Sequence, residues 1–328
     1  VEFSIERRDP ADDNQYAYNM LTKAYIGQAT QEFGPTILQN YSETENDAFY
    51  GNWQMSLFDE KIKTLAGLRR DKGGEVDGNK SAVTNPSIGI VYQPTNAWSF
   101  FVAYSESAKP QVQRERTGDP DSPVLPRQKG VGQEVGIRFD LFENRLIGNL
   151  MAFDLVKENI PIQISNGIYA PSGEQEAKGI EFDLMARPLE DLQIIFNVAY
   201  IDSEVVSDAN SPLLEGKSMH NAPEWQWNLA FNYSLTKGPL DGLRLIGGVK
   251  YVGGDRLQWS PPNGIFGESF ILGSYTVADL GAAYQWEVGD AAWEVRANLK
   301  NIFDEYYIIS RLYAGAPREL VLSVKVLF

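Results

Sequence analysis

The chain ends with Glu319-Leu-Val-Leu-Ser-Val-Lys-Val-Leu-Phe328, a stretch that alternates in polarity and stops on an aromatic residue. Successive side chains of a β-strand point to opposite faces, so the stretch has one apolar face and one mixed face. The apolar face consists of Leu320, Leu322, Val324, Val326 and Phe328. The mixed face includes Glu319, Ser323 and Lys325. This pattern predicts the closing strand of a membrane-spanning β-barrel, apolar outside and polar inside, with the last strand of a soluble β-sandwich as the alternative.

Composition excludes several classes of function. The chain has 29 Lys and Arg against 44 Asp and Glu, a net charge of −15, so we expect no nucleic-acid partner, because phosphate binding needs basic surfaces. The absence of Cys excludes disulfides and thiolate metal sites, and it suits a protein that crosses an oxidising compartment. No apolar run reaches the length of a transmembrane helix, and the mean hydropathy is −0.31.

Alternation recurs through most of the chain and is typical of strands with one apolar face. It is clearest from Trp225 onward, where Trp227, Leu229, Phe231 and Tyr233 fall on one face. The same split recurs at 180–187, 243–251 and 293–300. Aromatic residues lie near the predicted strand ends, as in the aromatic belts of membrane barrels. They are Trp98, Tyr104, Trp225, Tyr233, Tyr275, Tyr284, Trp286, Trp293 and Phe303.

The predicted connections alternate between long and short. We expect long ones at 105–128, 158–176, 202–221, 253–273 and 305–317. We expect short ones at 94–97, 142–144, 188–191, 236–241 and 289–290. Long loops at one end and tight turns at the other are typical of an antiparallel up-and-down barrel in an outer membrane. The pattern gives roughly 13 strands from Asp47 to Phe328 and about 14 with one further strand within Gln15–Gln28.

Residues 1–45 are poorly patterned and fit one barrel strand with an extracellular loop, although 15–30 fits a short helix equally well. Residues 46–328 are predicted to be the C-terminal portion of the barrel. The start of the chain has no basic segment followed by an apolar core, which is the pattern of a signal peptide.

Nine segments, taken in order, resemble the barrel strands of TonB-dependent receptors. The most distinctive is Asn298-Leu-Lys-Asn-Ile-Phe-Asp-Glu-Tyr-Tyr307, just before the closing strand. The others are Ala48-Phe-Tyr-Gly-Asn-Trp-Gln-Met-Ser-Leu-Phe-Asp59, Leu65-Ala-Gly-Leu-Arg69, Pro86-Ser-Ile-Gly-Ile-Val-Tyr-Gln-Pro94, Ala103-Tyr-Ser-Glu-Ser-Ala-Lys-Pro110, Gln133-Glu-Val-Gly-Ile137, Lys178-Gly-Ile-Glu181, Tyr251-Val-Gly-Gly254 and Tyr275-Thr-Val-Ala-Asp279. Together they cover about residues 46–328, and the stretch from Pro86 to Pro110 is most similar to the siderophore-receptor branch.

The resemblance implies a bacterial outer-membrane receptor with a plugged barrel of about 22 strands, energised by the TonB complex. It implies import of a scarce small-molecule ligand, most similar to a ferric siderophore, with no bound cofactor. It also implies that the terminal aromatic strand is part of the signal that the barrel-assembly machinery recognises. The N-terminal plug that contacts TonB is absent from these residues, so we expect the chain to be a C-terminal part of a longer receptor. A smaller self-closed barrel, acting as a passive pore or structural protein, is the alternative.

Catalysis and metal binding are not expected. The chain has one histidine, His220, and no Ser spacing around it indicates a catalytic triad. A single histidine cannot assemble a His-based metal site, and the acidic stretch 202–208 lacks the spaced ligands and glycine of a calcium loop.

Ligand contacts in such a receptor should come from aromatic and arginine side chains in the long loops, which can stack on or pair with an anionic chelate. The predicted ligand-binding residues are Arg127, Tyr169, Arg256, Trp259, Phe266, Arg311 and Tyr313. For each of them, loop packing is the competing interpretation. The charges on the predicted inner face should pair with each other or with the plug rather than with the ligand. They are Arg138, Glu181, Asp183, Arg244, Lys250, Glu294, Arg296 and Lys300.

Overall fold

The computed structural model describes residues 16–19, 24–28, 46–73, 82–109, 111, 113–119, 121–254, 256–258, 270–310 and 313–327. The chain divides into two units, Val1–Glu43 and Thr44–Phe328. In the first unit, β1 (Tyr16–Asn19) pairs antiparallel with β2 (Ala24–Gln28). The segment for which one strand or a short helix was expected therefore contains two short strands.

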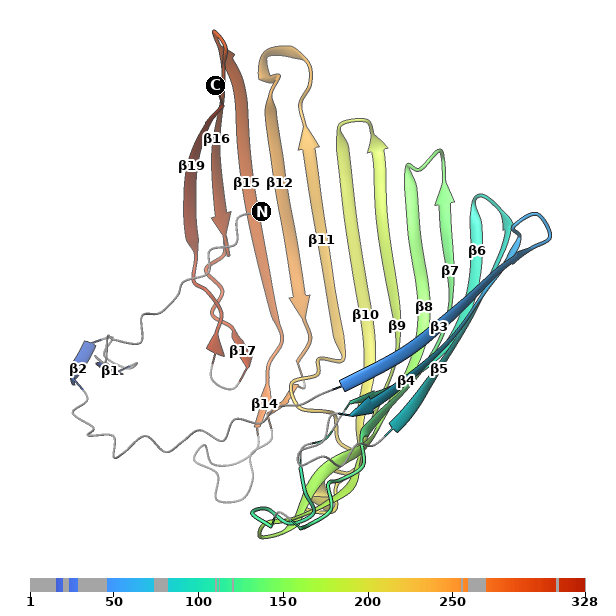
Figure 1. The fold of residues 1–328 in the computed structure, drawn as a ribbon. Coiled ribbons are helices and arrows are strands. Elements are labelled where there is room, and N and C mark those ends of the chain that lie inside the picture. The colour runs from blue at the N-terminus through green and yellow to red at the C-terminus, as the bar shows by residue number, and fades with distance from the viewer. Residues whose placement is uncertain are drawn as a thin grey trace. The chain divides into compact units, whose positions relative to one another are not determined.

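The second unit is built on one antiparallel sheet of 13 strands, in which each strand pairs with its neighbours along the chain (Figure 1). The expected up-and-down topology is confirmed. The strands are β3 (Asn46–Leu57), β4 (Ile62–Gly73), β5 (Ala82–Thr95), β6 (Trp98–Lys109), β7 (Gln128–Leu141), β8 (Leu146–Ser165), β9 (Ile168–Leu189), β10 (Leu192–Ser207), β11 (Trp225–Ser234), β12 (Leu243–Val252), β15 (Tyr275–Val288), β16 (Ala291–Lys300) and β19 (Glu319–Leu327). Within the described residues, β3 and β19 each pair on one side only, so the sheet is open.

Two small hairpins and two short 3₁₀ turns lie in the connections. The hairpins are β13 (Arg256–Gln258) with β14 (Phe270–Leu272), and β17 (Ile308–Ser310) with β18 (Tyr313–Ala314). The 3₁₀ turns are Pro212–Leu214 and Gly238–Leu240. No helix in the described part of the chain has the length and apolar character needed to cross a membrane.

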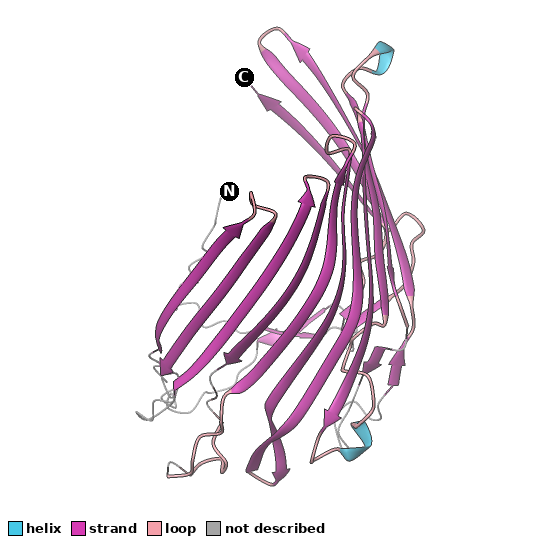
Figure 2. Cartoon of the chain, turned by 90° about the vertical axis from the view of Figure 1, so that its right-hand side faces the viewer, coloured by secondary structure: helices cyan, strands magenta, loops and turns pink. Residues whose placement is uncertain are grey.

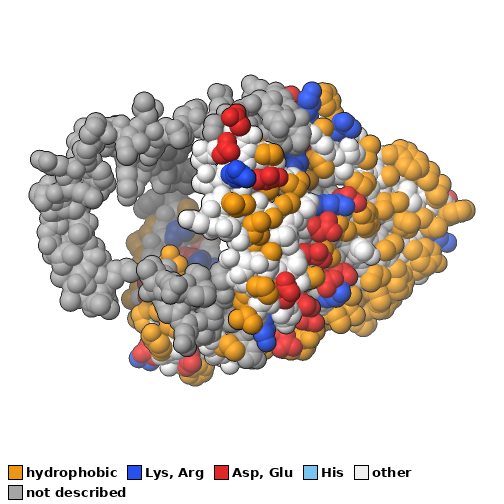
Figure 3. All heavy atoms as spheres, turned by 90° about the horizontal axis from the view of Figure 1, so that it is seen from below, with side chains coloured by type: hydrophobic (Ala, Val, Ile, Leu, Met, Phe, Trp, Pro, Cys, Tyr) orange, Lys and Arg blue, Asp and Glu red, His pale blue; other side chains and the backbone are white. Residues whose placement is uncertain are grey.

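Register gives the sheet one apolar face and one polar face. Leu280, Leu299 and Leu320 are paired in sequence across β15, β16 and β19, and the first and last are 51% and 61% exposed. Apolar side chains this exposed need a non-aqueous neighbour, because leaving them in water forfeits the free energy of their burial. Seen from below, hydrophobic side chains crowd one flank while acidic and basic ones gather nearer the middle of the view (Figure 3).

The two ends of the sheet differ, and Figure 2 shows tight turns at the upper end and longer connections at the lower end. We call them the short-turn end and the long-loop end. At the short-turn end, residues 58–61 and 142–145 form two similar turns, in which Phe58 and Phe142 are the first of three consecutive non-glycine residues with positive φ. The two turns also have similar sequences: Leu-Phe-Asp-Glu-Lys-Ile, starting at Leu57, and Leu-Phe-Glu-Asn-Arg-Leu, starting at Leu141.

The alternation of long and short connections is correct except at 158–176, where a long loop was expected. β8 and β9 instead continue through this region and join at Asn166 and Gly167, the latter with φ of 71°. The prolines and polar residues there resemble a loop in composition, but isoleucines alternate along β8. Ile160 and Ile162 cover Gly173, where an added Cβ would lie 2.8 to 2.9 Å from them. This packing stabilises the strands beyond the point at which the sequence indicates a loop.

Candidate binding site

Two of the predicted ligand-binding residues, Arg127 and Tyr169, are part of a folded layer at the long-loop end. The connection between β6 and β7 runs back along the β8–β9 hairpin, and the backbone N–H of Tyr169 donates to the carbonyl of Glu115 at 2.8 Å. A second bond joins Thr117 N–H to the carbonyl of Gly167, also at 2.8 Å. This connection therefore forms an isolated antiparallel bridge with the hairpin, between Arg116 and Ile168.

Asn159 fastens the other end of this connection. It lies at a bulge in β8 with φ of 58°, and its Nδ2 donates to the carbonyl of Arg127 at 3.1 Å. The side chain of Gln111 donates in turn to the carbonyl of Asn159 at 3.0 Å. Leu125, which belongs to the same connection, is 2% exposed. The two hydrogen bonds hold residues at both ends of the connection on the same bulge.

Arg127 is 9% exposed, and its charge acts on the carboxylate of Asp71, which is 5% exposed. Asp71 also accepts hydrogen bonds from Arg69 at 2.8 to 3.0 Å and from Asn85 at 3.3 Å. A carboxylate this deeply buried is stable only when it is paired, so Arg127 has a structural partner where it lies. A ligand contact of Arg127 stays a prediction.

The remaining predicted ligand residues are dispersed or lie outside the described residues. Tyr313 is 67% exposed in β18. The backbone of Arg256 pairs with Leu272 in β13 and β14, and its side chain lies outside the described part of the chain. Trp259, Phe266 and Arg311 also lie outside the described residues.

The closing strand has the predicted alternation. Leu320, Leu322 and Val324 are 61%, 68% and 64% exposed on the apolar face of β19, and Val326 is half-buried. Phe328 lies outside the described residues. Their role as a signal for barrel assembly stays a prediction.

A different set of residues encloses a pocket of about 430 Å³ on the polar face at the long-loop end. Direct pairing places Asn228 opposite Lys250 and Lys250 opposite Val277, while Gly248 lies opposite Asp279. Residues directly paired across an antiparallel sheet share a face, so these side chains line one wall. Tyr275 lies on the same face of β15, and Tyr307 lies in the connection between β16 and β19. We call this the tyrosine pocket. Its polar and aromatic lining residues are Asn228, Lys250, Tyr275, Asp279 and Tyr307, and Leu229, Ala230, Gly248, Val249, Val277 and Ile309 complete the lining.

The rings of Tyr275 and Tyr307 lie 4.5 Å apart between centroids at an angle of 32°, a close aromatic pair. Tyr275 is 8% exposed. The connection that carries Tyr307 packs tightly on itself, because a Cβ added at Gly315 would lie 1.9 Å from the Tyr307 ring. The N–H of Gly315 donates to the carbonyl of Tyr307 at 2.8 Å.

Asn301 organises this connection and joins it to the wall of the pocket. It is 2% exposed, and its Nδ2 donates to the carbonyls of Glu305 and Ala316 at 2.9 and 3.0 Å. Its Oδ1 accepts from the N–H of Glu305 at 2.9 Å. The N–H of Asn301 itself donates to Oδ1 of Asp279 at 2.8 Å, which fixes that carboxylate at the pocket edge.

The tyrosine pocket combines a cation, an amide, a carboxylate and two phenols. Within the described residues, the ammonium group of Lys250 has no ion-pair partner, and its side chain is exposed. Lys250 was expected to pair with other lumen charges or with the plug; no partner charge is recorded for it among the described residues, and pairing with the plug stays a prediction. An ammonium group beside an amide and aromatic faces can bind an oxygen-rich anionic ligand with planar or alkyl parts.

Other charges of the polar face do pair with each other as expected. Glu294 accepts from Arg296 at 2.8 Å and from Arg244 at 3.3 Å, and Lys300 pairs with Glu319 at 3.1 Å. Asp183 instead accepts from Asn197 at 2.6 Å. Arg138 lies over the ring of Phe101, with its guanidinium carbon 5.1 Å from the ring centroid.

Several residues of the tyrosine pocket have recognisable signals in the sequence. Tyr275, Asp279 and Tyr307 belong to segments that resemble the receptor family, and Asn228 and Lys250 fall on the polar side of the alternation. What the sequence does not show is the pairing that brings them together. In the described residues, no group of three or more His, Cys, Asp or Glu is placed to hold a metal ion. His220 lies in the connection between β10 and β11.

Comparison with known proteins agrees with this architecture. A family model described as TonB dependent receptor-like, beta-barrel, matches residues 7–302. The metal-pseudopaline receptor CntO of Pseudomonas aeruginosa is 31% identical over 336 residues, which cover 95% of this chain and 44% of the relative. The ferric-pyoverdine BN7/BN8 receptor of Pseudomonas putida is 30% identical over 265 residues, covering 79% of this chain and 30% of the relative. The chain thus spans less than half the length of these relatives.

Solved structures show the same fold. The ferric preacinetobactin receptor from Acinetobacter baumannii superposes with a TM-score of 0.72 at 23% identity, over 86% of this chain and 42% of that one. The ferripyoverdine receptor of the outer membrane of Pseudomonas aeruginosa gives 0.71 at 21% identity, over 86% and 38%. The relatives and structures named above are receptors for metal chelates. Because the family model matches residues 7–302, this chain belongs to the TonB-dependent receptor-like β-barrel family.

Proposed function

We propose that the polypeptide containing this chain is an outer-membrane receptor that imports a metal chelate, most similar to a ferric siderophore, and that the TonB complex energises it. The observation that carries the proposal is the tyrosine pocket, which faces the polar side of the sheet at its long-loop end. The relatives named for metal-pseudopaline and ferric-pyoverdine point to the same ligand class. A plug domain and its contact with TonB would come from the rest of the longer protein.

Transport in whole cells tests the proposal. Cells that depend on the full-length protein should accumulate radioactive iron supplied as a hydroxamate or catecholate chelate, and deletion of TonB should abolish the accumulation. Accumulation that persists without TonB, together with steady ion conductance of the purified protein in a planar bilayer, would instead establish a passive pore. Fractionation should place the protein in the outer membrane.

Lys250→Gln is expected to weaken chelate binding roughly tenfold, because it removes the charge from a charge-assisted hydrogen bond while leaving a polar side chain that is one atom shorter. Equilibrium binding of the iron chelate to the purified full-length receptor measures the change. Lys325→Gln is the matched control, since Lys325 lies on the same face of the sheet opposite Glu294, away from the pocket. Equal chelate affinities of the two variants would show that Lys250 does not contact the chelate.

A further inference from the structure

The tyrosine pocket contains two opposite charges that do not pair with each other. Lys250 of β12 lies opposite Val277 of β15. Asp279 lies two residues farther along β15, opposite Gly248. Such diagonal neighbours share a face of the sheet, with their β-carbons about 7 Å apart. Among the described residues no ion pair joins Lys250 to Asp279, and both side chains are exposed. One ligand can therefore reach a cation and an anion at the same time.

The carboxylate of Asp279 is held in place and still has room for a donor. Its Oδ1 accepts the N–H of Asn301 at 2.8 Å, and Asn301 is 2% exposed. The two oxygens of a carboxylate have about four acceptor sites, so one hydrogen bond leaves most of them to solvent or to a ligand. Gly248, directly opposite, has no side chain to cover the carboxylate. Asp279 is therefore an oriented, negatively charged acceptor, and a charged donor is the group that it binds most strongly.

The rings of Tyr275 and Tyr307 give a second reason for a cationic group in the ligand. Both rings line the pocket together with Asp279, and their centroids lie 4.5 Å apart. The face of an aromatic ring attracts an ammonium group through the ring quadrupole. An ammonium group in this pocket gains from the carboxylate and from the rings, whereas an anionic group beside Asp279 would be repelled.

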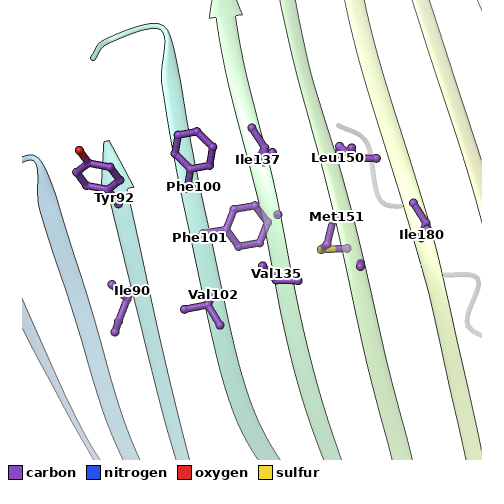
Figure 4. A pocket seen from close by; sticks show the side chains of 12 residues that line it. Ile90, Tyr92, Phe100, Phe101, Val102, Val135, Ile137, Leu150, Met151 and Ile180 are labelled. Carbon is purple, nitrogen blue, oxygen red and sulfur yellow. The ribbon is translucent and has the colours of Figure 1, made fainter. Parts of the chain in front are cut away.

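The larger hollow on the apolar face of the sheet has a different chemistry (Figure 4). It measures about 630 Å³ over β5 to β9, and its lining includes Val102, Val135 and Ile180. These side chains offer no partner to a charged group, which would lose its hydrogen bonds to water there without replacement. The charges of a ligand are matched by the tyrosine pocket and not by this hollow.

We propose that the chelate bound by the tyrosine pocket carries a protonated amine, which Asp279 binds while the ammonium group of Lys250 donates to oxygens of the metal-binding groups. This inference rests on the proposed function of the pocket and narrows its ligand class. A chelate built only from neutral and anionic groups leaves Asp279 without a charged partner. The pocket therefore prefers chelates that carry an amine.

Equilibrium binding of two iron chelates to the purified full-length receptor tests the inference. Ferrioxamine B is a linear trihydroxamate chelate with one free terminal amine, and its N-acetyl derivative has the same iron centre without that charge. The wild-type receptor should bind ferrioxamine B about tenfold more tightly than the acetylated chelate. Asp279→Asn should bind the two chelates equally, because the amide oxygen can still accept from the N–H of Asn301 but carries no charge.

Asp183→Asn is the matched control. Asp183 lies on the polar face outside the tyrosine pocket and accepts a hydrogen bond from Asn197 at 2.6 Å. Its replacement should therefore keep the wild-type preference for ferrioxamine B. Each variant must first show the heat-dependent shift in gel mobility of a folded barrel. The comparison of the two chelates on the wild type needs no variant, and it decides the inference if Asp279→Asn does not fold.

Three outcomes would contradict the inference. Equal binding of both chelates by the wild type, with TonB-dependent iron uptake intact, would overturn the amine contact and leave the proposed function standing. Loss of the preference in Asp183→Asn as well as in Asp279→Asn would overturn the assignment of the contact to Asp279. Binding of neither chelate, together with no iron uptake, would overturn the proposed function and this inference with it.

Discussion

Replacement of Asn301 by alanine is expected to cost about 4 kcal/mol of local stability in the connection between β16 and β19. The side chain makes three buried hydrogen bonds, two to carbonyls and one from a backbone N–H, and none has a water-exposed alternative at 2% exposure. Asn301 also has φ of 48°, which alanine tolerates poorly. The connection carries Tyr307, so its loosening should reach the tyrosine pocket.

Hydrogen exchange at the amide of Glu305 and limited proteolysis of the connection measure this effect in the full-length receptor. Asn301→Gly separates the loss of the side-chain hydrogen bonds from the strain of the positive φ. Glycine adopts this backbone conformation freely, so only the side-chain hydrogen bonds are lost. It should recover about 1 kcal/mol relative to alanine. Unchanged exchange in Asn301→Ala would show that the connection is held by other contacts.

Gly315→Ala is expected to displace the Tyr307 ring, because overpacking typically costs about 1 to 3 kcal/mol of stability. Loss of the ring's contact should weaken chelate binding roughly tenfold. The added Cβ would lie 1.9 to 2.2 Å from three ring carbons, far inside van der Waals contact. The ring can escape only by leaving its position against Tyr275. The strands themselves carry no new group, so the barrel should still fold.

Gly273→Ala is the matched control at the same end of the sheet, because an added Cβ there has no heavy atom within 4 Å. Equilibrium binding of the chelate and heat-dependent gel mobility should be measured for both variants. Weak binding by Gly315→Ala with normal binding by Gly273→Ala is the expected pair of results. Equal binding would show that Tyr307 does not contact the ligand.

The strands were predictable because their signal is local. Alternation at positions such as Trp225 to Tyr233 reports which face each residue occupies, and turn residues such as Gly289 mark the reversals. The small errors came where composition and packing disagree. In the β8–β9 hairpin, prolines and charged residues resemble a loop, while the isoleucines that extend the strands are stabilised by contact with a glycine on the paired strand.

The binding site was less predictable because it depends on contacts between distant segments. Arg127 has the chemistry of an anion-binding residue, but burial beside Asp71, from a strand more than 50 residues earlier, gives it a structural partner. Lys250 looked like one more charge on a polar face. Only the register of β11, β12 and β15 places it on the same pocket wall as Tyr275, in a pocket that Tyr307 also lines.

The long β8–β9 hairpin has a practical consequence for work on intact cells. On the apolar face of β8, Asp154 is the first charged residue beyond Ala152, and the strand runs eleven residues farther to Ser165, roughly 36 Å at a rise of about 3.3 Å per residue. If Asp154 marks the membrane surface, the tip at Asn166 and Gly167 stands several Debye lengths away from the lipid headgroups. An epitope tag inserted there would be displayed to an antibody outside the cell, and staining of unbroken cells would report both surface delivery and the orientation of the barrel.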